Sequence, residues 1–257
     1  MPHSPDEIPF GEGSMDRPAL LAALRARIAR LDAAGPADSV PLCEAISQRL
    51  PGGGLARATL HDVLAGDLGA AAGFCALVLA RAAAGGCGSL LWITGDLDAW
   101  PPGLARFGLS PADLILVKAP KPLDGLWAME ESLRCPGIAG AVLALRDPEP
   151  TAVRQLQLAA GTGGAIGLLL RPDTTDMEAS AALTRWRVGA LSGTGGAHDL
   201  GDPRWRLDLL RCRGGRPGNW RVTWRPAAER LDSDDAERLE EAEPAETPAR
   251  IPRHRAG

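Results

Sequence analysis

Short apolar runs alternate with helical patterns through the middle of the chain. Five runs rich in aliphatic residues are bounded by turn residues, and they cover 57–64, 88–94, 113–119, 140–146 and 165–171. Helical patterns separate several of these runs, near 70–84, 122–134 and 150–161. Nearly continuous apolar strands that alternate with helices are typical of a mostly parallel sheet covered on both faces. The pattern therefore predicts an α/β fold.

The pattern changes toward the C-terminal end, where alternation replaces continuous apolar runs. Further strands are predicted at 185–191, 205–213 and 219–226, with the glycine-rich turn "GGRPG" before the last of them. In that last strand tryptophan or valine alternates with arginine or threonine from Trp220 to Arg225. This period of two predicts an antiparallel β-hairpin over 204–225 with two chemically different faces.

The two ends differ from the middle in composition. Residues 1–18 are polar and are predicted to be disordered, and an amphipathic helix is predicted over 19–31, outside the core. The apolar stripe of this helix consists of Leu20, Leu24, Ile28 and Leu31. Between 229 and 246 nine acids stand against two arginines, so 226–257 is predicted to be a disordered acidic tail. The predicted globular domain is 40–225.

Composition limits the classes of function. At 257 residues with 45% hydrophobic content, the chain can bury the core of one large domain. A formal net charge of −4 disfavours a surface built as a whole for nucleic acid, although seven arginines between 204 and 225 leave room for a local basic patch. Five scattered cysteines without a C-x-x-C pair indicate a reducing cytoplasm. The polar N-terminal stretch is unlike a signal peptide, and no apolar run reaches the ~20 residues of a membrane span.

The stretch "LHDVLAGDLGAAAGFCALVLARA" at 60–82 predicts a strand, a tight turn and a long helix, as in a phosphate-binding loop. That loop needs the pattern G-x-x-x-x-G-K-[ST], because lysine neutralises the phosphates and the hydroxyl holds magnesium. Here Gly66 and Gly69 are followed by Ala70 and Ala71. The two lysines of the chain both lie in "VKAPKP", far from the turn. The turn is therefore a degenerate phosphate loop or, alternatively, a plain alanine-rich helix start.

Other reactive residue types form no recognisable constellation. The histidines have neither metal spacing nor a paired acid, so structural or surface roles are expected for His3, His61, His198 and His254. No serine lies in a G-x-S-x-G frame, as judged at Ser89, Ser132 and Ser192. Trp92 and Trp127 are predicted to be core residues. We predict no catalytic residue, no cofactor and no metal.

Several stretches carry a resemblance to a known family. The segment "LPGGGLARATLHDVLAG" at 50–66 is similar to the one that leads into the phosphate loop of the RecA core. The stretches "GLARFGLSPADLILVKA" and "LWAMEESLR" resemble sequences of the ImuA family, the RecA-like accessory proteins of bacterial SOS mutagenesis. "AVRQLQLAAGTGGAIGLLLRP", "AALTRWRV" and "LLRCRGGRPGNW" continue the resemblance, which covers about 40–225. The resemblance implies a RecA-like, mostly parallel sheet flanked by helices.

The RecA chemistry is mostly missing from the matching positions. The phosphate-loop lysine and threonine correspond to Ala70 and Ala71, and the water-activating acid would fall near Asp96, which is a methylene shorter than glutamate. The metal-orienting acid should close the run at 140–146, yet Asp147 comes late. The loop after the strand at 165–171 carries three acids and no base. The resemblance thus implies a pseudo-ATPase with weak or absent DNA binding.

By this resemblance we expect a non-enzymatic accessory protein of SOS-induced translesion synthesis. Its expected partners are an ImuB-like inactive Y-family polymerase homologue, an error-prone C-family DNA polymerase and, as a further candidate, RecA. The alternatives are a SulA-like cell-division inhibitor and a true RecA-family ATPase. Nucleotide binding would identify the ATPase, and the co-purifying partner would identify the inhibitor.

Partner contacts are predicted in two places. Leu24 and Ile28 of the amphipathic helix are predicted to dock on a RecA-type partner, because their apolar stripe lacks a mate. The hairpin carries tryptophan and arginine, the residue types most enriched at interface hot spots. The predicted contact residues there are Trp205, Arg211, Arg213, Arg216, Trp220 and Trp224. The acidic tail is expected either to fold back on the hairpin arginines or to engage a basic partner.

Overall fold

A computed structural model of the chain describes residues 39–84, 88–96, 99–173, 180–193 and 201–234. The predicted disordered segment 1–18, the predicted helix 19–31 and residues 235–257 of the predicted tail lie outside the described residues. No helix of the described part is both long and apolar enough to cross a bilayer.

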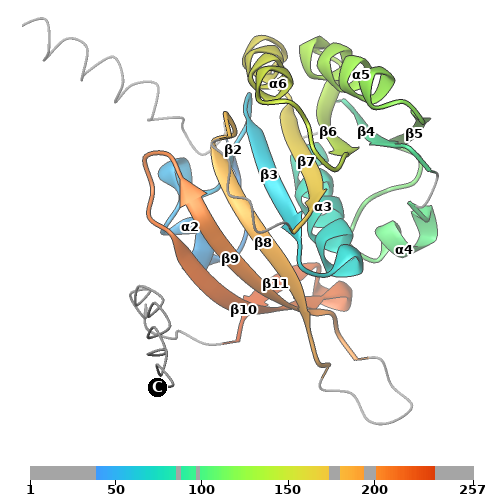
Figure 1. Cartoon of the computed structure of the whole chain (residues 1–257). Helices are drawn as coiled ribbons and strands as arrows, with labels where there is room; N and C mark the ends of the chain where they lie inside the picture. The colour runs from blue at the N-terminus through green and yellow to red at the C-terminus, as the bar shows by residue number, and fades with distance from the viewer. Residues whose placement is uncertain (1–38, 85–87, 97–98, 174–179, 194–200, 235–257) are drawn as a thin grey trace, which may run out of the picture.

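One nine-stranded sheet forms the centre of the molecule (Figure 1). Its spatial order is β11 (Arg230–Ser233), β10 (Gly218–Arg225), β9 (Arg204–Cys212), β8 (Thr184–Leu191), β3 (Leu60–Ala65), β7 (Ile166–Pro172), β6 (Ile138–Ala144), β4 (Ser89–Thr94) and β5 (Leu114–Lys118). Pairing is parallel from β8 to β5 and antiparallel from β8 to β11. The predicted fold class is confirmed, and the predicted hairpin is β9 and β10.

Helices cover the two faces of this sheet unequally. The long helix α3 (Leu68–Ala83) packs on one face, together with α2 (Glu44–Ser47) and the small sheet of β1 (Ser39–Val40) and β2 (Leu55–Ala56). On the other face α5 (Pro122–Arg134) and α6 (Pro150–Gly163) cover β4, β6 and β7 (Figure 1). Proline at the first helical position starts α5 and α6, since its missing N–H needs no partner there.

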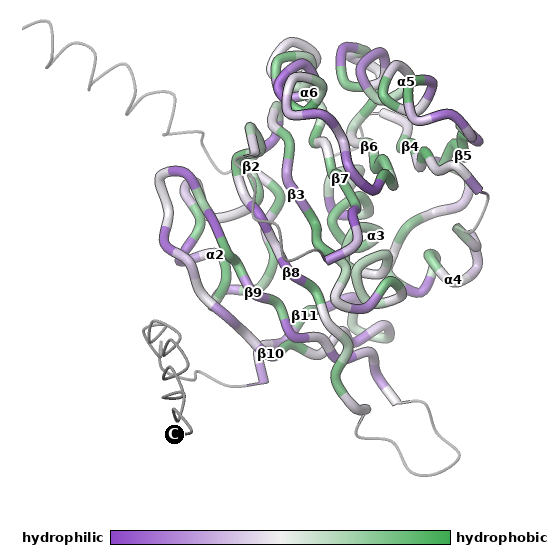
Figure 2. The backbone as a smooth tube through the Cα atoms, in the orientation of Figure 1, coloured by the Kyte–Doolittle hydropathy of each residue, from purple (hydrophilic) through white to green (hydrophobic). Residues whose placement is uncertain are grey.

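Two hydrophobic cores follow from this layering. The core on the α3 face includes Phe74, Trp186 and Trp205, and the core under α5 and α6 includes Met129 and Leu156. Figure 2 shows long hydrophobic stretches through the parallel strands and a quicker change between polar and apolar positions in β8 to β10. These are the two patterns that distinguish strands buried on both faces from strands buried on one.

The prediction that both Trp92 and Trp127 are core residues is only half right. Trp92 on β4 is 2% exposed, whereas Trp127 on α5 is 65% exposed. The helical period explains the difference, because Gly125, Met129 and Leu133 define the buried stripe of α5 and Trp127 lies off it.

The ordered domain extends beyond the predicted boundary at 225. Pro226–Ala228 form a 3₁₀ turn and β11 follows, with Leu231 paired to Trp224 of β10 and itself buried. The prediction of disorder from 226 onward is therefore wrong for 226–234. The five-residue helix α4 (Pro101–Ala105) lies between β4 and β5. The sequence pattern did not indicate the short elements α2, β1 and β2.

Candidate functional site

The turn between β3 and α3 stands where a phosphate loop would bind its ligand. Two residues, Gly66 and Asp67, separate the end of β3 at Ala65 from the start of α3 at Leu68. The side chain of Asp67 caps the helix, because its Oδ1 accepts a hydrogen bond of 2.7 Å from the Ala70 N–H. The Asp67 N–H in turn donates to the Val188 carbonyl at 3.1 Å. A carboxylate of the chain itself thus takes the position at the helix N-terminus that favours a phosphate.

The two alanines after the turn face inward. Ala70 is 7% exposed and Ala71 is fully buried in the core of the α3 face, where a lysine or a metal-binding hydroxyl could not reach solvent. Lys118 ends β5 at the edge of the sheet, four strands away from β3, and Lys121 precedes α5. Gly66 also packs closely, since an added Cβ would lie 3.1 Å from the Val188 oxygen.

The acids considered for water activation and metal orientation are exposed loop residues. Asp96 follows β4 and Asp147 follows β6, so both stand near the carboxyl edge of the parallel strands. Ser132 is buried and its hydroxyl donates to the Ala128 carbonyl at 2.6 Å, as a helix-interior serine commonly does. Among the described residues, no three His, Cys, Asp or Glu side chains lie close enough to hold a metal ion.

His61 on β3 is a buried histidine with a complete hydrogen-bond set. Its Nε2 lies 2.9 Å from the Ala56 carbonyl and its Nδ1 lies 2.7 Å from the Thr184 hydroxyl. A carbonyl can only accept, so Nε2 carries the proton and Nδ1 accepts from Thr184. Burial lowers the pKa of His61 to about 4, which keeps the ring neutral. This agrees with the structural role expected for it; the other three histidines lie outside the described residues.

A buried ion pair lies beside His61, at the junction of β3 and β8. Asp62 and Arg185 are register partners, and Asp62 Oδ2 accepts from Arg185 Nε at 3.1 Å and from Nη2 at 3.0 Å. Asp62 is fully buried and Arg185 is 4% exposed. The pair ties the antiparallel strands to the parallel ones. No pattern in the sequence indicates it, because 123 positions separate its members.

The tryptophans predicted as contact residues lie mostly in the core. Trp205 is 3% exposed and packs on the rings of Phe74 and Phe107, with ring centroids 6.4 and 5.5 Å apart. Trp224 is 2% exposed, and its Nε1 donates to the Arg106 carbonyl at 2.7 Å. The assignment of these two tryptophans to a partner surface is therefore corrected, because they point toward α3. Trp220 is half-buried against Trp186.

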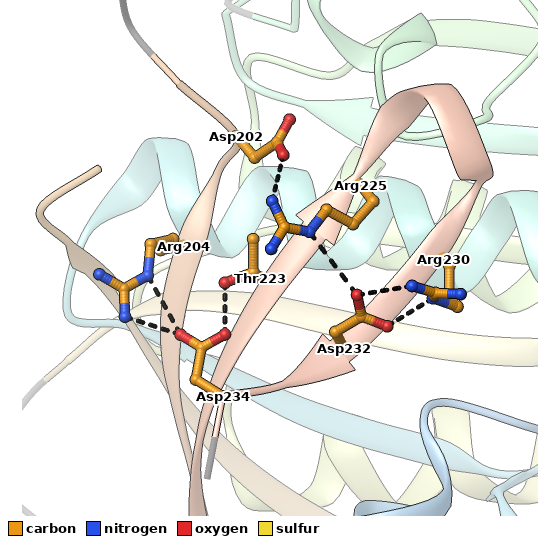
Figure 3. Close-up of polar contacts among 7 residues, drawn as sticks. All are labelled: Asp202, Arg204, Thr223, Arg225, Arg230, Asp232 and Asp234. Atoms are coloured by element: carbon orange, nitrogen blue, oxygen red, sulfur yellow. Dashed lines mark hydrogen bonds and ion pairs between the residues drawn. The ribbon is translucent and has the colours of Figure 1, made fainter. Parts of the chain in front are cut away.

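The opposite face of β8 to β11, which we call the outer face, carries the charges of the hairpin. No described helix lies over it in Figure 1. Asp234 accepts from Arg204 Nη2 at 2.7 Å and from the Thr223 hydroxyl at 2.5 Å (Figure 3). Burial would raise the pKa of Asp234, but the hydrogen bonds from Thr223 and Arg204 outweigh it and hold that pKa below its usual value.

A second group of charges adjoins this pair on the outer face. Arg225 contacts Asp202 at 2.6 Å and Asp232 at 3.6 Å, and Asp232 also accepts from Arg230 (Figure 3). Asp232 and Asp234 belong to the segment predicted as an acidic tail. For these two residues the structure shows the fold-back on hairpin arginines, which was one of the two expected outcomes.

The remaining predicted contact residues are arginines near the β9–β10 turn. Arg211 donates to the Ser180 carbonyl at 2.7 Å, whereas Arg213 and Arg216 are exposed. Leu24 and Ile28 lie outside the described residues. The structure therefore brings the three predicted arginines to one end of the hairpin, where Trp220 is the one predicted tryptophan that remains partly exposed.

Fold and site together define an α/β protein with a mostly parallel sheet, in which the turn after β3 lacks the side chains of a phosphate-binding loop. No family model matches the chain. The chain is 36% identical over 186 residues to Protein ImuA from two strains of Caulobacter vibrioides, an alignment that covers 66% of this chain and 76% of that protein. It belongs to the ImuA family, and with that to the accessory proteins of SOS mutagenesis.

Proposed function

We propose that this ImuA-family chain supports translesion DNA synthesis as a binding protein and not as an enzyme. Its partners in this proposal are an ImuB-like inactive Y-family polymerase homologue and an error-prone C-family polymerase, with RecA as a third. The RecA-like body serves as a scaffold whose surfaces contact these proteins. Family membership supports the biological process, and the geometry of the β3–α3 turn supports the absence of ATP chemistry.

The observation that carries the proposal is the helix cap made by Asp67. A nucleotide phosphate would have to displace the carboxylate that already binds the Ala70 N–H at 2.7 Å. It would then find buried alanines where lysine and threonine supply contacts worth about 1.5 to 3 kcal/mol each. The loss of both contacts weakens nucleotide binding by at least about two orders of magnitude.

Calorimetry with ATP and with ADP at millimolar concentration tests the first half of the proposal, with RecA as the positive control. We expect no saturable heat and no DNA-stimulated hydrolysis. Saturable binding in the micromolar range would contradict the proposal. Because the turn is closed by Asp67, the Asp67→Ala variant is a useful companion, and it should still bind no nucleotide since Ala70 and Ala71 remain.

Co-purification with the ImuB-like protein tests the second half. Truncation after Leu191 is a poor test, because it removes β9 to β11 and with them the core residues Trp205 and Trp224. Charge reversal of Arg213 and Arg216 together leaves the core intact and should weaken the complex at least about tenfold if the hairpin turn is the contact. Arg154→Glu on α6 is the matched control. If both variants bind the ImuB-like protein as tightly as the wild type does, the contact lies elsewhere on the domain.

A further inference from the structure

A groove runs along the carboxyl edge of the parallel strands, on the side of the turn that a nucleotide would use. It consists of two adjoining cavities of about 360 and about 410 Å³, which share Leu68, Ala144 and Leu170 as lining residues. These three residues come from α3, β6 and β7, so the groove crosses the ends of several strands. Grooves in this position are the usual ligand sites of open α/β sheets.

One half of the groove is apolar. It lies between the first turns of α3 and helix α4, and Trp100, Leu104 and Phe107 line it. Leu68 at its rim is 60% exposed and Trp100 is 70% exposed. An exposed tryptophan and leucine beside an apolar cavity are typical of surfaces that bind another protein.

The other half of the groove is basic. Arg146 and Arg171 line it, together with Thr94 and with Asp96, the one acid among the described lining residues. In the described part of the chain neither arginine makes an ion pair, and the buried Nε of Arg171 has no hydrogen-bond partner there. The outer face differs, since Arg204, Arg225 and Arg230 each contact an aspartate. The two groove arginines therefore offer donors to an external carboxylate.

We propose that this groove binds a short peptide segment of a partner protein, with a large apolar side chain in the apolar half and a carboxylate within a few residues of it. A nucleotide fits less well, because Asp67 closes the adjacent helix N-terminus and the chain supplies no lysine to the groove. The apolar half selects the anchor residue, and Arg146 and Arg171 select the charge. The inference deepens the proposed function. The identity of the partner rests on the proposed function, whereas the binding of a peptide to the groove does not.

A displayed library of random dodecapeptides, selected on the full-length chain, tests this inference. We expect enrichment of peptides that combine leucine or an aromatic residue with nearby aspartate or glutamate. Fluorescence polarisation with an enriched peptide should show affinity at least tenfold weaker for Arg146→Glu with Arg171→Glu, and about tenfold weaker for Trp100→Ala. The matched control is Arg221→Glu on β10, outside the groove, which should bind with unchanged affinity.

Three outcomes would overturn the inference. If the enriched peptides lack carboxylates, or if they bind the groove variants as tightly as the wild type, the basic half of the groove does not select the peptide. A tenfold gain in peptide affinity on removal of 235–257 would identify that segment of the chain itself as the occupant. Proper folding of each variant is checked by its melting temperature, since all four substituted side chains are partly or largely exposed.

The ImuB-like protein separates this inference from the proposed function. If the wild-type chain binds that protein and the groove variants bind it equally well, the groove inference fails and the proposed function stands. If the wild-type chain does not bind it, whereas the groove still selects acidic and apolar peptides, the proposed partner is wrong and the groove inference stands.

Discussion

The parallel half of the sheet, β3 to β7 in sequence order, and the antiparallel half, β8 to β11, use their residues differently. In the parallel half α3 covers one face, and α5 and α6 cover the other, so β6 and β7 are apolar almost throughout. In the antiparallel half one face packs on α3 through Trp186, Trp205 and Trp224, and the outer face carries arginine and aspartate. The first half contains the strand, turn and helix of β3 and α3 in a sheet covered on both faces, and the second half forms a charged surface whose arginines and aspartates largely neutralise each other.

This comparison locates the accessible charge of the molecule. Seven arginines in 204–225 suggest a basic patch, yet aspartates from β9, β11 and the loop before β9 lie against several of them. Arg146 and Arg171 of the groove, which make no ion pair with any residue that the structure describes, lie instead in the parallel half, beside exposed Trp100 and Leu68. A net count of charges in a segment thus does not reveal which of them can meet a ligand.

Adjacent residues of β9 offer the sharpest test of the two-faced antiparallel half. We expect Trp205→Ala to lower the free energy of unfolding by about 4 kcal/mol, because it leaves a cavity beside Phe74 and Phe107. Arg206→Ala should change it by less than about 0.5 kcal/mol, since the Arg206 side chain is 60% exposed and its contact with Asp208 lies at the surface. Urea unfolding measures both. Equal effects of the two substitutions would mean that the faces are wrongly assigned.

The junction of the two halves depends on the buried pair of Asp62 and Arg185. Asp62→Ala leaves a buried guanidinium without its carboxylate, and we expect the free energy of unfolding to fall by about 3 kcal/mol. The double variant Asp62→Leu with Arg185→Met removes both charges and should regain most of that loss, because apolar residues of similar volume can replace a buried pair. A double variant no more stable than Asp62→Ala would show that the charge itself is not the cause.

Much of this fold could be predicted from the sequence, and the misses have physical reasons. Continuous apolar runs located β4, β6 and β7 to within a few residues, because a strand that is buried on both faces needs apolar residues at nearly every position. β11 was missed because four residues within an acidic stretch carry no apolar pattern beyond Leu231. The alternation in the sequence places Trp220 and Trp224 on the same face of their strand. A period of two does not show, however, whether that face packs on the core or faces solvent.

The candidate site was predictable only in part. The lack of lysine and threonine after Gly66 is evident in the sequence, and Asp67 directly before an apolar helix is a recognisable N-cap signal. The groove was not predictable, because Trp100, Arg146 and Arg171 come from separate loops and strands. Only the order of the strands in the sheet brings these residues to the same carboxyl edge. The pairing of Asp62 with Arg185 depends on the same long-range topology.

The smallest expected effect concerns the outer face and its acids. Asp234→Ala removes the contacts with Arg204 and Thr223, and we expect a loss of about 0.5 to 1 kcal/mol at pH 7, since both charged side chains retain some exposure. The pKa of Asp234 is lower in the folded state than in the unfolded chain, so its contribution is present above the unfolded pKa of about 4 and disappears as the pH falls through the folded value. Urea unfolding of wild type and variant between pH 7 and pH 3 should therefore show two curves that converge toward acid. Arg221→Ala on the same face, which removes a charge without an ion pair in the described part, should follow the wild type at every pH. A constant gap between wild type and Asp234→Ala down to pH 3 would mean that the aspartate acts by packing alone, and the outer face would then not be a set of ion pairs in solution.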